Sequence, residues 1–188
     1  MSSSKGGGQV NLDQIKSGLN PPFDLNIIIE VPLGGEPIKY EIDKASGALF
    51  VDRFLYTPMR YPGNYGFIPR TLCGDGDPLD AIVMNSRPLV PGSVVRCRPV
   101  GVLVMEDENG SDEKIIVLPV PKLTRVYDSV QSIADLPSIQ VERVKHFFAH
   151  YKDLEGGKWS RVDRVGDVED AKTFITQAIE LFQNKGNP

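Results

Sequence analysis

The sequence has few cysteines and lacks any long apolar stretch. Cys73 and Cys97 are the two cysteines among 188 residues, which is too few for a disulfide framework. No apolar run approaches the roughly 20 residues that a membrane helix needs, and the first residues lack the pattern of a signal peptide. We therefore expect a cytoplasmic protein with free thiols.

The chain also has no surplus of positive charge. Its 21 Lys and Arg residues face 25 Asp and Glu residues, a net charge of -4, so no overall basic field attracts nucleic acid or an anionic membrane. There is no P-loop, no G-x-G-x-x-G motif and no internal repeat. With 40% hydrophobic residues, the length suits one domain over residues 1–188, of which 1–10 are expected to form a mobile polar tail.

Hydrophobic patterns predict strands over the first two-thirds of the chain. Leu25–Val31 should be buried on both faces, and Ile38–Ile42 alternates apolar with charged residues. Further strands are expected at 48–54, 81–84, 94–105 (bent at Pro99 and Gly101) and 115–118, with a hairpin turn at Asn109-Gly110. The segment 56–70 is too rich in Pro and Gly for a long element, so we expect an ordered loop.

The last third is predicted to be helical. Ser138 should cap a first helix and Asp167 a second one, and each helix has one apolar face. These faces consist of Val144, Phe147, Phe148 and Tyr151 in the first helix, and of Ala171, Phe174, Ile175, Ala178 and Phe182 in the second. The fold class is therefore mainly β (α+β), an OB-like closed β-barrel with two appended C-terminal helices; a sandwich is the alternative.

Carboxylates are densest in the motif DGDPLD at residues 75–80. Gly76 and Pro78 favour a loop rather than a helix or a central strand. On such a loop Asp75, Asp77 and Asp80 would repel one another unless a cation lies between them. Because carboxylate oxygens are the ligands that Mg²⁺ prefers, the motif predicts a magnesium site.

Other interpretations of this motif exist. Most acidic turns are simply solvated. An EF-hand loop is excluded, since its sixth position would be Asp80 instead of Gly and its twelfth Ser86 instead of Glu. A sugar-phosphate mutase also has such an acidic run, but those enzymes resemble much longer chains. The metal hypothesis therefore depends on the other charged residues of the chain.

Further acids and bases rise from the predicted strands and their adjoining loops. Glu30 stands within an apolar strand, where a charge is uncommon without a partner. Asp107 and Asp112 flank the hairpin tip, although acidic tips are usually solvated. The bases are Lys39, Arg53, Lys114 and Lys152, and the candidate phenols are Tyr65 and Tyr151. Acids and bases together suit a polyanionic substrate that is bound with metal.

Two histidines, His146 and His150, have the i, i+4 spacing of zinc ligands on a helix. Phe147 follows His146 where a metalloprotease has Glu, and no third ligand is evident. We favour a role in packing or in a subunit contact. Tyr61 and Tyr65 are likewise interpreted as packing residues more readily than as ligands.

The motif at 75–80 resembles the signature of soluble inorganic pyrophosphatases of the first family. Five further segments are similar to the bacterial form in the same order: PIKYEIDK (37–44), GALFVDR (47–53), YPGNYG (61–66), PGSV (91–94) and HYKDL (150–154). The resemblance extends from about Leu25 to Trp159. It implies an OB-like barrel, a homohexamer and Mg²⁺ as the cofactor, with several ions per subunit.

The resemblance also implies roles for individual residues. In that family the matching acids bind metal, and they correspond to Glu30, Asp75, Asp80, Asp107 and Asp112. The acid that matches Asp77 is the general base toward a water that bridges two metals and attacks phosphorus. The phosphates are bound by the residues that match Lys39, Arg53, Tyr65, Lys114, Tyr151 and Lys152. The implied reaction is hydrolysis of pyrophosphate to two orthophosphates.

Two other kinds of protein are alternatives to the enzyme that the resemblance implies. An OB-type nucleic-acid binder needs a basic groove with stacking aromatics, and the net negative charge disfavours it. A non-catalytic metal-binding protein would bind Mg²⁺ without releasing phosphate. Neither accounts for the ordered set of similar segments.

Overall fold

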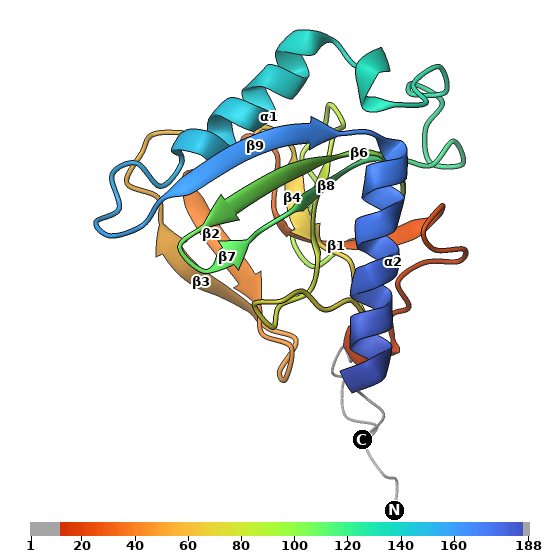
Figure 1. Cartoon of the computed structure of the whole chain (residues 1–188), viewed down its shortest axis with the longest axis horizontal. Coiled ribbons are helices and arrows are strands. Elements are labelled where there is room, and N and C mark those ends of the chain that lie inside the picture. The colour runs from red at the N-terminus through yellow and green to blue at the C-terminus, as the bar shows by residue number, and fades with distance from the viewer. Residues whose placement is uncertain (1–11, 186–188) are drawn as a thin grey trace, which may run out of the picture.

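Strands dominate the computed structural model, which describes residues 12–185 (Figure 1). The polar tail expected at residues 1–10 lies outside this range. The strands are β1 (Leu25–Val31), β2 (Ile38–Ile42), β3 (Leu49–Phe54), β4 (Asn64–Phe67), β5 (Asp80–Val83), β6 (Val94–Asp107), β7 (Gly110–Ser111), β8 (Lys114–Pro119) and β9 (Ser160–Gly166). The helices are α1 (Ser138–His150) and α2 (Val168–Lys185), with short 3-10 turns at Leu12–Gln14 and Ile133–Asp135.

Pairing between strands forms an OB-like barrel. The order β1-β4-β5-β8-β6 returns to its start because β1 also pairs with β6. All these pairs are antiparallel except β5 with β8. Not every strand takes part in the ring, since β2 and β3 form a separate two-stranded sheet. The predicted fold class is confirmed, with a barrel that is less strictly closed than expected.

Central strands are buried on both faces, as the sequence predicted for Leu25–Val31. In β5, Ile82 packs in a cluster with residues of α1, whereas its neighbours Ala81 and Val83 pack in a second cluster with residues of α2. The same alternation runs along β8, because successive side chains of a strand point to opposite faces. Each helix therefore covers a different face of the sheet.

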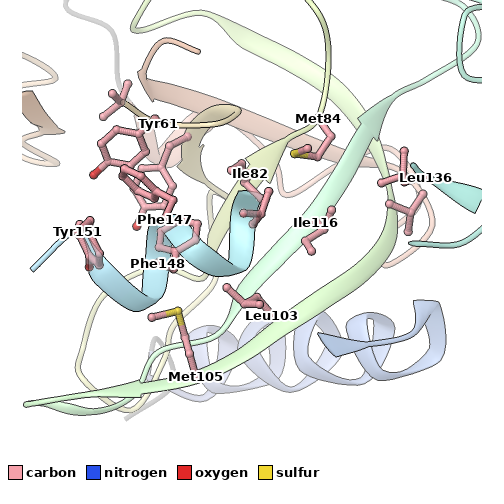
Figure 2. Close-up of a cluster of buried hydrophobic side chains, with 14 of the residues drawn as sticks. Tyr61, Ile82, Met84, Leu103, Met105, Ile116, Leu136, Phe147, Phe148 and Tyr151 are labelled. Carbon is pink, nitrogen blue, oxygen red and sulfur yellow. The ribbon is translucent and has the colours of Figure 1, made fainter. Parts of the chain in front are cut away.

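Aromatic side chains join α1 to the barrel. Phe147 and Phe148 are almost fully buried, and the ring centroid of Phe147 lies 4.6 Å from that of Tyr61. Figure 2 shows these rings beside Tyr61 and Tyr151, with Ile82, Leu103 and Ile116 of the sheet farther along the same cluster. This packing fixes the end of α1 against the cavity described below.

Several boundaries differ from the sequence-based expectations. The segment 56–70 contains a buried strand, β4, and the last third contains β9 between its helices. Pro137 is the N-cap of α1 and Ser138 its first residue, so the predicted Ser138 cap is wrong. The Asp167 cap is confirmed, since its Oδ1 accepts hydrogen bonds from the N–H groups of Glu169 and Asp170 at 2.9 Å.

Other local predictions are confirmed. The register of β6 with β8 shifts between Pro99 and Gly101, and Gly110 turns the hairpin with a φ of 118°. On α2, Ala171, Ile175 and Ala178 are buried. Phe182 is an exception on that face, because it is 37% exposed. Within residues 12–185, neither helix has the combination of length and apolar sequence that spanning a membrane requires.

Candidate active site

One cavity of about 460 Å³ gathers the charged residues that the sequence singled out. Its wall is formed by strand ends and by the loops next to them. All twelve predicted site residues line it: Glu30, Asp75, Asp77, Asp80, Asp107, Asp112, Lys39, Arg53, Lys114, Lys152, Tyr65 and Tyr151. Residues more than 100 positions apart in the chain thus face the same space.

The pairing of β5 with β8 sets the middle of this wall. Asp80 is the first residue of β5 and Lys114 the first of β8, and the parallel register places them side by side. The Lys114 Nζ lies 2.5 Å from Asp80 Oδ2 and also donates to Asp112 Oδ1. A buried ammonium therefore lies between two of the predicted metal ligands.

Lys114 keeps its charge because of these two acids. Burial alone would lower the pKa of Lys114, but Asp80 and Asp112 outweigh burial and raise that pKa well above its ordinary value. Burial also raises the pKa of the Asp112 carboxyl, which disfavours its charged form, although the charge of Lys114 opposes that shift. The Tyr65 hydroxyl donates to Asp80 Oδ2 at 2.5 Å, so Asp80 has two donors.

Lys152 forms a second cationic centre at the end of α1. Its Nζ donates to Asp107 Oδ2 at 2.7 Å and lies 3.0 Å from Glu108 Oε2. Burial opposes ionisation of Asp107, but the hydrogen bonds from Lys152 and from the Asn109 N–H, together with the charge of Lys152, outweigh it and lower the pKa of this carboxyl. Asp107 is thus held as an anion at the end of β6.

Glu30 is the buried acid that the strand pattern marked as unusual. It is 7% exposed, and its Oε1 accepts a hydrogen bond from the Ile42 N–H at 2.8 Å. Burial raises the pKa of Glu30 to about 8, although the Ile42 N–H opposes the shift. A nearby cation would therefore favour ionisation of this side chain near neutral pH.

The remaining cations approach the cavity from β2, β3 and the turn between them. Lys39 contacts Glu41, and its Nζ lies 3.4 Å from Asp52 Oδ2. Lys44 Nζ lies 2.7 Å from Asp77 Oδ1, in a pair that is exposed on both sides. This pair links the β2–β3 turn to the acidic loop.

Sequence reasoning missed several residues of the cavity wall. Lys44 and Glu41 belong to the segment 37–44, and Tyr61 belongs to the segment 61–66; both segments are similar to the bacterial pyrophosphatases. No sequence pattern around Glu108 or Lys158 indicates that these residues belong to the site. Tyr61 and Tyr65 pack in the aromatic cluster, as expected, and they also line the cavity, where a role as ligands stays a prediction.

The oxygen donors of the cavity are chemically suited to Mg²⁺. As the described residues stand, no three His, Cys, Asp or Glu side chains are grouped to hold a metal ion, since Lys114 and Lys152 lie among the acids. The eight carboxylates that line the cavity nevertheless fit a hard cation, which would take over part of the charge neutralisation that these ammonium groups provide.

The two histidines of α1 lie apart from this chemistry. The ring centroids of His146 and His150 are 4.7 Å apart. His150 Nδ1 lies 2.8 Å from Asp153 Oδ2, on the exposed side of the helix end. Their contact with another subunit stays a prediction.

The chain is similar to known proteins over most of its length. A model of the inorganic pyrophosphatase family matches residues 27–183. An inorganic pyrophosphatase from Agrobacterium fabrum is 57% identical over 177 residues, which is 94% of this chain and 100% of that protein.

Solved structures agree with the sequence relatives. An inorganic phosphatase from Anaplasma phagocytophilum has a TM-score of 0.88 and 46% identity, with 90% of this chain and 99% of that one covered. An inorganic pyrophosphatase from Coxiella burnetii has a TM-score of 0.87 and 46% identity, covering 89% and 99%. With the family match, the barrel and the charged cavity in agreement, the chain belongs to the inorganic pyrophosphatase family.

Proposed function

We propose that this protein hydrolyses pyrophosphate to two orthophosphates with Mg²⁺ as its cofactor, several ions being bound per subunit. The observation that carries the proposal is the convergence of eight carboxylates and six cationic side chains on one cavity in a member of this family. Acids without bases would suit metal storage, and bases without acids would suit anion capture, whereas both together suit a metal-bound diphosphate.

The acids at the strand ends are proposed to hold the cofactor. These residues are Glu30, Asp75, Asp80, Asp107 and Asp112. When bound, Mg²⁺ would neutralise phosphate oxygens and make the attacking water more acidic. Because Lys114 already contacts Asp80 and Asp112, this lysine and the cation would compete for the same carboxylates.

The other residues act on the substrate and on the water. Asp77 is proposed as the general base, and its side chain is 70% exposed on the loop that borders the cavity. The cations neutralise charge on the phosphates, and the phenols donate hydrogen bonds to them. This group comprises Lys39, Arg53, Lys114, Lys152, Tyr65 and Tyr151. Little covalent chemistry is asked of the protein, so the rate depends on positioning and charge neutralisation.

The proposal extends to the setting of the enzyme. The thiols of Cys73 and Cys97 are unbridged, in keeping with a reducing compartment, and we propose a cytoplasmic location. We also propose the homohexamer that the resemblance implies.

The decisive experiment measures phosphate release from pyrophosphate and from ATP, with and without Mg²⁺. We expect release from pyrophosphate that EDTA abolishes and added Mg²⁺ restores. Turnover that survives EDTA would end the metal hypothesis. Mg²⁺ binding without phosphate release would indicate a metal-binding protein with no catalytic role, and a gel shift of oligonucleotides at low salt would favour nucleic-acid binding.

A further inference from the structure

Glu155 is a buried carboxylate that stands behind the cavity instead of in its wall. It is 9% exposed, and it is absent from the side chains that line the space. Its backbone N–H donates to the carbonyl of Lys152 at 2.8 Å. The position of Glu155 is therefore tied to the end of α1, where Tyr151 and Lys152 enter the cavity.

Each oxygen of Glu155 lies near a cation that does line the cavity. Oε1 is 3.3 Å from Arg53 Nε, and Oε2 is 3.3 Å from Lys158 Nζ. Arg53 comes from β3, about 100 residues earlier in the chain. The carboxylate thus connects the separate β2–β3 sheet with the turn that follows α1.

The contact with Arg53 is close but is not a hydrogen bond. Among the buried side-chain atoms of residues 12–185, Arg53 Nε and Glu155 Oε1 are two of those without a hydrogen-bond partner. A buried ion pair with unsatisfied polar atoms contributes little to stability, since desolvation offsets the attraction. A role in placing the guanidinium explains this arrangement better than a role in folding.

The geometry also shows what competes for Arg53. Its NH1 atom lies 3.6 Å from Asp52 Oδ2, and the same carboxylate oxygen lies 3.4 Å from Lys39 Nζ. Without the negative charge of Glu155, Asp52 would be the nearest charged partner of Arg53. The guanidinium would then be drawn along β3, away from the turn after α1. The Glu155 contact engages Nε, and the 3.6 Å from NH1 to Asp52 is longer than a hydrogen bond, so both terminal nitrogens can donate to a phosphate in a planar, two-point contact.

We propose that Glu155 is a positioning residue that holds Arg53, and with it Lys158, where these cations meet the phosphates of the substrate. The inference rests on the proposed function, because it names a residue that acts on the same cavity through its lining side chains.

The test compares Glu155→Gln and Glu155→Asp with the wild-type protein. The Gln variant keeps the shape of the side chain and removes its charge, so we expect kcat/KM for pyrophosphate to fall about tenfold, the loss typical of a residue that orients a ligand. The melting temperature should stay close to that of the wild type. Glu155→Asp keeps the charge and should recover part of the loss. The matched control is Glu169→Gln, which removes an exposed glutamate that pairs with Lys172 at 2.7 Å.

A double-mutant cycle with Arg53→Gln shows whether Glu155 acts through the arginine. In the Arg53→Gln background, most of the effect of Glu155→Gln should disappear, because coupled residues are not additive. Unchanged kcat/KM in Glu155→Gln, or full additivity in the double variant, would overturn the inference. Should the Gln variant fail to fold, a loss of kcat/KM in Glu155→Asp that adds in full to the loss in Arg53→Gln would overturn it instead.

The same experiment separates the inference from the function on which it rests. If neither the wild type nor Glu169→Gln releases phosphate from pyrophosphate, the proposed function is refuted. If the wild type is active and Glu155→Gln has the same kcat/KM, the positioning role alone is refuted.

Discussion

The three acids of the 75–80 loop differ in their surroundings. The Asp77 side chain is 70% exposed and pairs with Lys44, whereas that of Asp80 is 26% exposed beside Lys114. Asp75 Oδ1 accepts a hydrogen bond from the Asp77 N–H at 3.0 Å. Asp80 is therefore the member of the loop that contacts a buried cation, whereas Asp77 pairs with an exposed one.

Replacing these acids one at a time should separate the base from the metal ligands. Asp75→Asn and Asp80→Asn remove a charge that holds the cation, so both variants should need more Mg²⁺ and recover activity when it is supplied. Asp77→Asn cannot accept the proton and should lose about 10²–10⁴-fold in rate, with little rescue by metal and partial rescue at higher pH. The measurement is the rate of phosphate release against Mg²⁺ and pH. Full rescue of Asp77→Asn by Mg²⁺ would show that it is not the base.

Glu30 predicts a pH dependence of stability in the metal-free protein. Its pKa rises from 4.5 to about 8 on folding, so the folded state holds the proton more tightly. The stability that Glu30 contributes is thus complete below pH 4.5 and is lost as the pH rises to 8, by up to about 5 kcal/mol. Glu30→Gln cannot titrate and can still accept the Ile42 N–H.

Urea unfolding in EDTA at pH 5 and pH 8 measures this effect. The difference in unfolding free energy between the wild type and Glu30→Gln should move in favour of the variant as the pH rises. Parallel changes in the two proteins would contradict the raised pKa.

At the scale of single residues, the sequence predicted which side chains share the cavity but not how they pair. All twelve candidates line it, because strand ends and adjoining loops converge in a small barrel. The contacts of Lys114 with Asp80 and of Lys152 with Asp107 follow from strand register and from the docking of α1. Neither distance is encoded in any local segment, so the pairing could not be predicted.

At the scale of elements, β4 depends on a glycine that allows two strands to approach. Gly66 pairs with Ile29 of β1, and a Cβ atom on Gly66 would lie 1.9 Å from the Ile28 carbonyl oxygen. The neighbouring atom belongs to the backbone, so it cannot move aside without breaking the β1–β4 pairing.

Gly66→Ala should therefore lower the free energy of unfolding by about 3 kcal/mol or more. Gly74→Ala is the control, because a Cβ atom there would meet nothing within 4 Å. Its effect should stay within about 0.5 kcal/mol. Urea denaturation of both variants makes the comparison, and equal stabilities would refute the close approach at Gly66.

The elements that the sequence missed share a physical reason. β4 lies in a segment rich in Pro and Gly, and its four residues are held by pairing with β1 and β5. β9 is mostly polar and mostly not buried, and it is held by its ladder to β6. In both cases partners distant in the sequence determine the strand, whereas β1 and β5 can be predicted from their own apolar residues.

At the scale of the whole molecule, the described surface carries many large apolar side chains. Phe50 and Phe54 on β3 are 56% and 64% exposed, and Ile139 on α1 is 60% exposed. Contacts between subunits would remove such surface from water. We expect light scattering at neutral pH to give a mass six times that of the chain, stable over a dilution series. A monomer at working concentration would contradict the proposed hexamer.

The parallel register of β5 and β8 makes activity a readout of correct folding. Asp80 and Lys114 lie together because each begins its strand and the two strands align at that point. A slip of one residue would turn Asp80 and Lys114 to opposite faces, while leaving apolar residues on both sides, since Ala81, Ile82, Ile115 and Ile116 are all buried. Hydrophobic burial alone therefore distinguishes poorly between the two alignments. A barrel with the wrong register would still be compact but would be inactive. The specific activity per folded molecule would therefore measure the fraction of a refolded sample that has the correct register.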